Sequence, residues 1–123
     1  MSSYGSEIKA NVEEAITLLQ AAKDHLETDQ FEAAASRASD SAFHTARALL
    51  LDEEIEPARH GDVITLLQKI FVNGRRLTKE QGANLNWLFA MRNAENRVTS
   101  EEAQRAVEIA GSFFEAAKVI LEG

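Results

Sequence analysis

Four residues with charged or titratable side chains recur at one-turn spacing inside an otherwise small and apolar stretch of the sequence. They are Arg37, Asp40, His44 and Arg47. Residues three or four apart lie on the same side of an α-helix, so these side chains form one stripe along a helix. A contact between Asp40 and His44 would raise the histidine pKa. The stripe predicts either a cluster that binds a phosphate or a partner's carboxylate, or a solvated or dimer-facing surface with ion pairs along the helix.

A second candidate segment reads Arg-Asn-Ala-Glu-Asn-Arg over residues 92–97, at the end of another predicted helix. Its two guanidinium groups, on Arg92 and Arg97, form a small basic patch that can bind an anion. A structural interpretation is equally open. An arginine near a helix C-terminus interacts favourably with the helix dipole, and Asn93 can cap that end.

Taken together, residues 36–51 and 92–97 resemble the HEPN domains, small all-helical proteins named for nucleotide binding in higher eukaryotes and prokaryotes. Many HEPN domains are RNases that need no metal, and they carry Arg-Asn, three variable residues and then His. Arg92 and Asn93 fit this pattern, whereas Arg97 stands at the position of the histidine.

The resemblance extends over about residues 7–121, nearly the whole chain. Residues 36–50 resemble the second helix of small stand-alone prokaryotic HEPN proteins. In those relatives two tyrosines commonly occupy the positions of Ser39 and Asp40, so this sequence departs from the pattern there. Any role that the tyrosines play does not carry over to this chain.

The resemblance implies a mechanism of which this sequence supplies only a part. Active HEPN nucleases pair about a two-fold axis and bring two copies of the motif together. Their arginine stabilises charge on the scissile phosphate, and their histidine moves a proton at the ribose 2′-hydroxyl. Such chemistry needs a base with a pKa near neutral and a cation for the developing charge. Arg97 can supply the cation but cannot accept a proton.

Two histidines elsewhere in the sequence are candidates for the missing base. His44 could serve if the fold brings it within hydrogen-bond reach of Arg92. His60 follows Arg59 just before a predicted helix, where a helix N-terminus beside basic side chains can bind an anion. The alternative for His60 is that it caps the helix and packs against a neighbour.

Helical patterning predicts the elements that position these residues. Apolar side chains recur at helical spacing in five stretches, at about residues 6–27, 30–53, 62–72, from Thr78 to Arg92, and 99–121. Three residue pairs match the capping-box pattern, namely Asp29 with Glu32, Thr78 with Gln81, and Thr99 with Glu102. Gly74 is predicted to end the third helix in the left-handed conformation. We therefore expect an all-α fold, an antiparallel bundle of four main helices plus one short helix.

Length and composition narrow the class of protein. The 123 residues suffice for a single domain, residues 1–123, of which we expect residues 1–5 to be disordered. The absence of cysteine excludes disulfides and thiolate metal sites. The sequence contains neither a signal-peptide pattern nor a long apolar run, so we expect a cytoplasmic protein with no membrane partner. The net charge of −7 argues against broad affinity for nucleic acid, although local basic patches such as Arg75, Arg76 and Lys79 remain.

The resulting prediction is a non-catalytic or weakly active HEPN-domain protein that binds nucleotide or RNA, without a cofactor or metal. The resemblance implies a homodimer and a nucleotidyltransferase partner, in a two-component toxin–antitoxin system. The residues expected to contact ligand or partner are Arg37, Asp40, His44, Arg47, Arg92, Asn93 and Arg97. The alternatives are a metal-independent RNase that uses Arg92 with His44 or His60, and a helical scaffold without a ligand.

Overall fold

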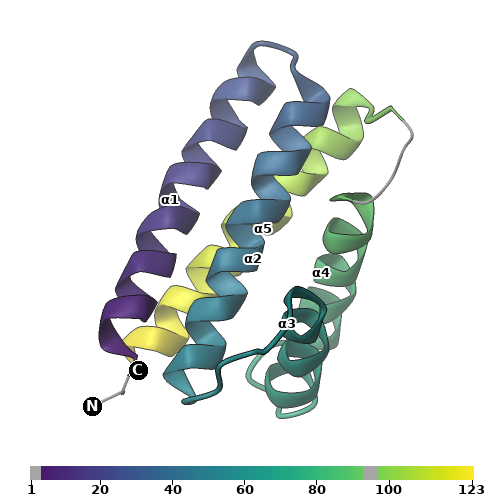
Figure 1. Ribbon diagram of the computed structural model, residues 1–123. Coiled ribbons are helices and arrows are strands. Elements are labelled where there is room, and N and C mark those ends of the chain that lie inside the picture. The colour runs from purple at the N-terminus through teal and green to yellow at the C-terminus, as the bar shows by residue number, and fades with distance from the viewer. Residues whose placement is uncertain (1–3, 93–96) are drawn as a thin grey trace.

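The computed structural model describes residues 4–92 and 97–123, and for Arg92 it describes the backbone. Five α-helices and one π-helical turn follow one another along the chain (Figure 1). They are α1 (Gly5–Glu27), α2 (Phe31–Asp52), α3 (His60–Leu67), the π-helical turn η1 (Gln68–Val72), α4 (Lys79–Arg92) and α5 (Ser100–Glu122). The described residues contain no strand. The expected all-α fold with one short helix is confirmed.

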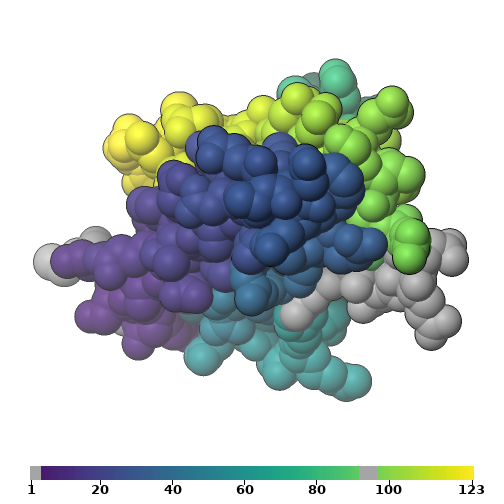
Figure 2. All heavy atoms as spheres, turned by 90° about the horizontal axis from the view of Figure 1, so that it is seen from above, coloured from purple at the N-terminus to yellow at the C-terminus, as the bar shows by residue number. Residues whose placement is uncertain are grey.

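Helix α2 is the centre of the bundle, because it packs against α1, α3, α4 and α5. In Figure 1 α1 and α2 run antiparallel side by side, α5 passes behind them, and α4 flanks α2 on the side away from α1. Seen from above, the turn between α1 and α2 occupies the middle of the visible face, with α5 along one side of it (Figure 2). The last turn of α5 returns to the end of the bundle where α1 begins (Figure 1).

Small side chains explain why α2 can accept so many neighbours. Its alanines at positions 34, 35, 38, 42 and 46 are all buried, as expected from their spacing, and small side chains let helix backbones approach closely. The approach is close enough for the buried Ser41 hydroxyl to donate a hydrogen bond of 2.7 Å to the Ala15 carbonyl of α1. Among the described residues, the packing leaves one face of α2 uncovered.

Two of the three predicted capping boxes are confirmed. The Thr78 amide donates to the Gln81 side chain at 2.7 Å, and the Gln81 amide donates to the Thr78 hydroxyl at 3.0 Å. Thr99 and Glu102 make the same reciprocal pair at the start of α5. Two otherwise unpaired amides at each helix start are thereby satisfied.

The third predicted capping box, at Asp29, is wrong. Asp29 lies in the left-handed region with φ 58°, and the N-cap of α2 is Gln30, which makes no side-chain capping bond. The two long helices are joined by a very short connection, and Asp29 adopts the left-handed conformation that reverses the chain there. Aspartate is among the few residues that tolerate this conformation, so its type reflects the turn rather than a cap.

The prediction for Gly74 is also wrong, because Arg75 and not Gly74 has a positive φ, 64°. Gly74 is required for a different reason, since a Cβ atom there would lie 2.2 Å from the Ile70 carbonyl oxygen. The preceding helix also begins earlier than expected, at His60 rather than near Asp62, and it ends in the π-helical turn η1.

Candidate functional site

The predicted stripe forms the uncovered face of α2. Arg37 is exposed, and Asp40, His44 and Arg47 are half-buried, while most of the remaining side chains of this helix are buried. The Arg37 guanidinium lies 4.0 Å from the Asp40 carboxylate, as expected for residues one turn apart. The structure therefore brings all four stripe residues to one side of one helix, where a ligand or a partner can reach them.

His44 is held in a defined orientation by α1. Its Nδ1 atom lies 2.8 Å from Oδ1 of Asn11. A carboxamide oxygen can only accept a hydrogen bond, so Nδ1 carries the proton and Nε2 keeps its lone pair in the neutral ring. Neutral His44 is thus oriented as a proton acceptor.

The Asp40 carboxylate acts on the pKa of His44 in the expected upward direction, but the net shift is downward. Burial lowers the pKa of His44 below its ordinary value, and the charges of Arg47 and His60 lower it further. The carboxylates of Glu14 and Asp40 act in the opposite direction but are outweighed. Sequence spacing revealed the nearby Asp40 carboxylate but not the loss of solvent around the ring, which favours the neutral form.

His60 joins the stripe through Phe43. The rings of Phe43 and His60 are parallel within 8°, with centroids 3.8 Å apart, and the Phe43 ring also meets His44 edge-on at 5.8 Å. His60 is the first residue of α3, and its N-cap Arg59 makes no side-chain capping bond. The packing part of the interpretation of His60 is therefore confirmed, and the stack fixes the start of α3 on α2. The capping part is wrong, because Arg59 and not His60 is the N-cap of α3.

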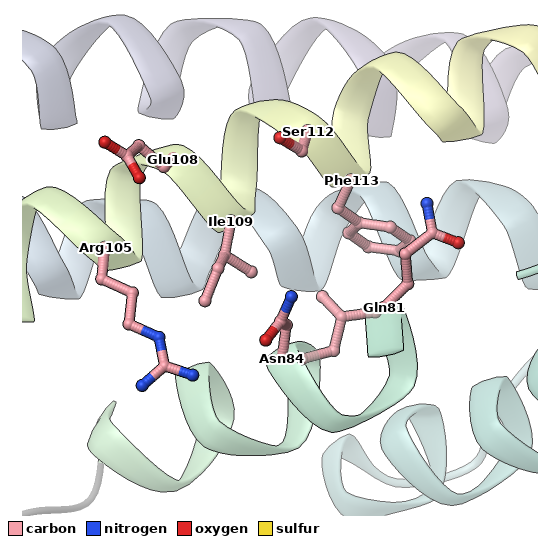
Figure 3. Close-up of a pocket in the computed structure, with 8 residues that line it drawn as sticks. Gln81, Asn84, Arg105, Glu108, Ile109, Ser112 and Phe113 are labelled. Atoms are coloured by element: carbon pink, nitrogen blue, oxygen red, sulfur yellow. The ribbon is translucent and has the colours of Figure 1, made fainter. Parts of the chain in front are cut away.

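Two hollows lie outside the stripe. The first, of about 270 Å³, is a groove between α4 and α5 (Figure 3). Its walls include Gln81 and Asn84 from α4 and Arg105 from α5. None of these three residues was predicted from the sequence to belong to a site. Gln81 was predicted only as a capping residue, and Asn84 and Arg105 resemble ordinary solvent-facing helix positions. Only the packing of α4 against α5 brings them together.

The second hollow, of about 420 Å³, lies within residues 72–79. It gathers Arg75, Arg76 and Lys79, the basic patch noted in the sequence. Arg76 is engaged, since its guanidinium pairs with Glu53 and lies 4.6 Å from the centre of the Phe71 ring. Arg76 therefore fastens this loop to the end of α2, whereas Arg75 and Lys79 form no ion pair with any residue that the structure describes.

Comparison with known proteins decides the family. The family model described as HEPN domain matches residues 8–120. The chain belongs to the HEPN domain family. This HEPN chain is 34% identical over 124 residues to a protein of Methanocaldococcus jannaschii named "Putative toxin MJ0605", covering 94% of this chain and 90% of that relative. It is 28% identical over 106 residues to "Putative toxin MJ0142" of the same organism, covering 82% of this chain and 72% of that relative.

The HEPN motif segment lies between α4 and α5. Arg92 is the last residue of α4, whereas its side chain, Asn93 and the rest of residues 93–96 lie outside the described residues. Arg97 is described and exposed, two residues before the N-cap of α5. The groups described around His44 belong to α1, α2 and α3. Because the Arg92 side chain is not among the described residues, the predicted proximity of His44 to Arg92 stays a prediction.

Two further findings concern metals and membranes. Within residues 4–92 and 97–123, no group of three histidine, cysteine, aspartate or glutamate side chains is placed to hold a metal ion. In the same residues, no helix combines the length and the apolar character that crossing a bilayer requires.

Proposed function

We propose that this HEPN protein is the toxin-like component of a two-component system and that it binds RNA or nucleotide without cutting it efficiently. The names of the two archaeal relatives support the toxin-like role. The observation that carries the non-catalytic role is the residue type at position 97. Arg97 supplies positive charge where HEPN RNases have their proton-transferring histidine, and an arginine is not a base at any ordinary pH.

The proposed contact surface is the stripe on α2 together with the motif arginines. It presents Arg37, Asp40, His44 and Arg47 on the one uncovered side of the central helix. Mixed charges on such a face suit a protein partner as well as a phosphate. We propose that this face serves the homodimer or a nucleotidyltransferase-type partner, with Arg92, Asn93 and Arg97 adding to the ligand contacts.

A second candidate function, metal-independent RNA cleavage, is favoured by the state of His44. Its lowered pKa keeps the imidazole neutral near physiological pH, and its bond to Asn11 leaves Nε2 free to accept a proton. A neutral, oriented imidazole is the group that Arg97 cannot replace. On this hypothesis Arg92 stabilises the phosphate charge, and a ribose hydroxyl lies beside His44.

One cleavage experiment separates the two functions. A mixed RNA pool is incubated with EDTA and with wild-type protein, Arg92→Ala, His44→Gln or Arg97→His, and Lys118→Gln on the exposed side of α5 is the matched control. The non-catalytic proposal expects no cutting by the wild type above the level of Arg92→Ala, and a gain of cutting in Arg97→His. Reproducible wild-type cutting that disappears in both Arg92→Ala and His44→Gln would establish the RNase instead.

The two-component part of the proposal has its own test. The protein is expressed in a bacterial host from an inducible promoter, alone or together with the product of the neighbouring open reading frame. We expect growth arrest on its own and recovery with the neighbour, which should be of the nucleotidyltransferase type. Double substitution of Arg37 and Arg47 by glutamine should weaken the complex of the two purified proteins. Normal growth without the neighbour would contradict the toxin-like role.

A further inference from the structure

The groove between α4 and α5 combines an apolar floor with polar walls. Its floor is made by Leu85, Ile109 and Phe113, all of which are buried. Figure 3 shows Ile109, Phe113 and Arg105 pointing from α5 towards α4, with Gln81 and Asn84 on the facing helix. The groove is therefore shaped for a ligand with one apolar surface and polar groups along its edges.

Arg105 is a positioned cation that has no anionic partner among the residues that the structure describes. Its guanidinium carbon lies 4.1 Å from the centre of the Trp87 ring, so the side chain is held by a cation–π contact. Within residues 4–92 and 97–123, no carboxylate forms an ion pair with it. Glu108 also lines the groove, but its side chain points away from α4 in Figure 3. A guanidinium held by its face presents its N–H edges to a carboxylate or a phosphate.

The two carboxamides add further donors. Oε1 of Gln81 already accepts a hydrogen bond from the Thr78 amide in the capping box of α4, so the amide group of Gln81 has its N–H donors left for a ligand. The side chain of Asn84 makes no hydrogen bond within the described part of the chain. Arg105, Asn84 and Gln81 together offer an excess of donors, which calls for a ligand rich in acceptors.

The size and polarity of the groove limit the class of ligand that it can bind. The volume of about 270 Å³ is slightly below the roughly 300–1,000 Å³ typical of sites for drug-sized ligands, so the occupant is small. An inorganic anion would leave the apolar floor uncovered, and a neutral apolar compound would leave the guanidinium without an anion. An anionic group attached to a flat apolar body would both cover the apolar floor and pair with the guanidinium.

We propose that the α4–α5 groove binds a small organic anion, a carboxylate or a phosphate monoester on an aromatic body. The anionic group meets Arg105, the body covers Ile109 and Phe113, and acceptor atoms on its edge meet Asn84 and Gln81. The groove shares no residue with the α2 stripe or the HEPN motif. The inference therefore stands whether or not the protein is a toxin or cuts RNA.

Four probes test the groove in ¹H–¹⁵N NMR titrations of the full chain. Benzoate and phenyl phosphate carry an anionic group on a ring, benzamide is the neutral counterpart of benzoate, and inorganic phosphate lacks the ring. We expect at least one of the two aromatic anions to bind about tenfold more tightly than benzamide and inorganic phosphate. The shifts should centre on the side-chain signals of Trp87, Arg105 and Asn84. Which aromatic anion binds more tightly then identifies the head group.

Variants locate the binding. Arg105→Gln should weaken the tighter aromatic anion about tenfold, and Lys118→Gln, an equal change of charge elsewhere on α5, should leave it unchanged. Asn84→Asp keeps the shape of the wall and the Arg105–Trp87 contact but adds a negative charge, so it should weaken binding even if Arg105→Gln perturbs the helix. The proposal is overturned if neither aromatic anion binds below about 20 mM, or if both groove variants bind like the wild type.

Discussion

At the scale of single residues, the decisive effect is the competition between burial and charge at His44. Asp40 and Glu14 stabilise the imidazolium form, whereas burial, Arg47 and His60 favour the neutral ring. The balance lowers the pKa of His44, and a half-buried ring in this state accepts a proton less readily than a free histidine does. Its environment therefore includes opposing charges that can be removed one at a time.

Removing these charges should move the His44 pKa in opposite directions. Asp40→Asn removes an attraction for the imidazolium and should lower the pKa further, whereas Arg47→Gln removes a repulsion and should raise it. Lys118→Gln is the distant control. The measurement is an NMR titration of the His44 ring protons. Shifts of the same sign in the two stripe variants would mean that the charges do not act on His44 as described.

The same shift makes folding stability depend on pH. Because the folded pKa is lowered from 6.5, the unfolded chain binds the proton more readily, and the free energy of unfolding rises with pH in this window. The contribution is fully present above the unfolded value of 6.5 and is lost as the pH falls through it towards the folded value. Urea unfolding should show that the free energy of unfolding falls more between about pH 7.5 and about pH 5.5 for the wild type than for His44→Gln. Equal losses would assign the pH dependence to other groups.

At the scale of elements, α4 lies so close to η1 at Gly82 that any larger residue there would force neighbouring side chains to move. A Cβ atom at Gly82 would lie 2.8 Å from Oε1 of Gln68 and 2.9 Å from Cγ2 of Val72. Gln68 also donates hydrogen bonds to the Gly82 carbonyl at 2.9 Å and to the Asn86 side chain at 3.1 Å. The π-helical turn thus presents a side chain that fastens α4, the helix which carries the HEPN motif at its other end.

Two glycine-to-alanine substitutions should change stability in opposite directions. Gly82→Ala forces the contact with Gln68 and Val72 apart, and we expect a loss of about 1–3 kcal/mol despite the better helix propensity of alanine. At Gly111, in α5, a Cβ atom would meet nothing within 4 Å, so Gly111→Ala should stabilise by about 0.5–1 kcal/mol. Urea denaturation of both variants gives the comparison. Stabilisation by Gly82→Ala would show that α4 does not lie this close to η1.

The sequence predicted those elements whose signal is local. The long helices follow from apolar spacing, and the caps at Thr78 and Thr99 follow from two residues three positions apart. Asp29 matched the same pattern but lies in a left-handed turn, since the short connection between α1 and α2 sets its conformation. The stripe on α2 was predictable for the same local reason. The groove beside Arg105 was not, because it exists only where two separately predicted helices meet.

At the scale of the whole molecule, a net charge of −7 confines anion binding to local sites. The described arginines of the proposed RNA surface are few, and Arg37 lies near the Asp40 carboxylate. An RNA that approaches this protein meets a repulsive field outside these sites. We therefore expect the surface to favour a short single strand over a long duplex, which would need a continuous basic track.

The salt dependence of RNA binding measures how local the contact is. Each neutralised phosphate of a single strand contributes about −0.7 to the slope of log K against log salt, so two to four arginine contacts predict a slope of roughly −1.5 to −3. Fluorescence anisotropy with a short labelled RNA at several salt concentrations gives this slope. Arg97→Gln should make it shallower by about 0.7, while Lys118→Gln should not change it. A slope steeper than about −6 would instead require an extended basic surface, and the RNA would then have to bind beyond the stripe and the motif.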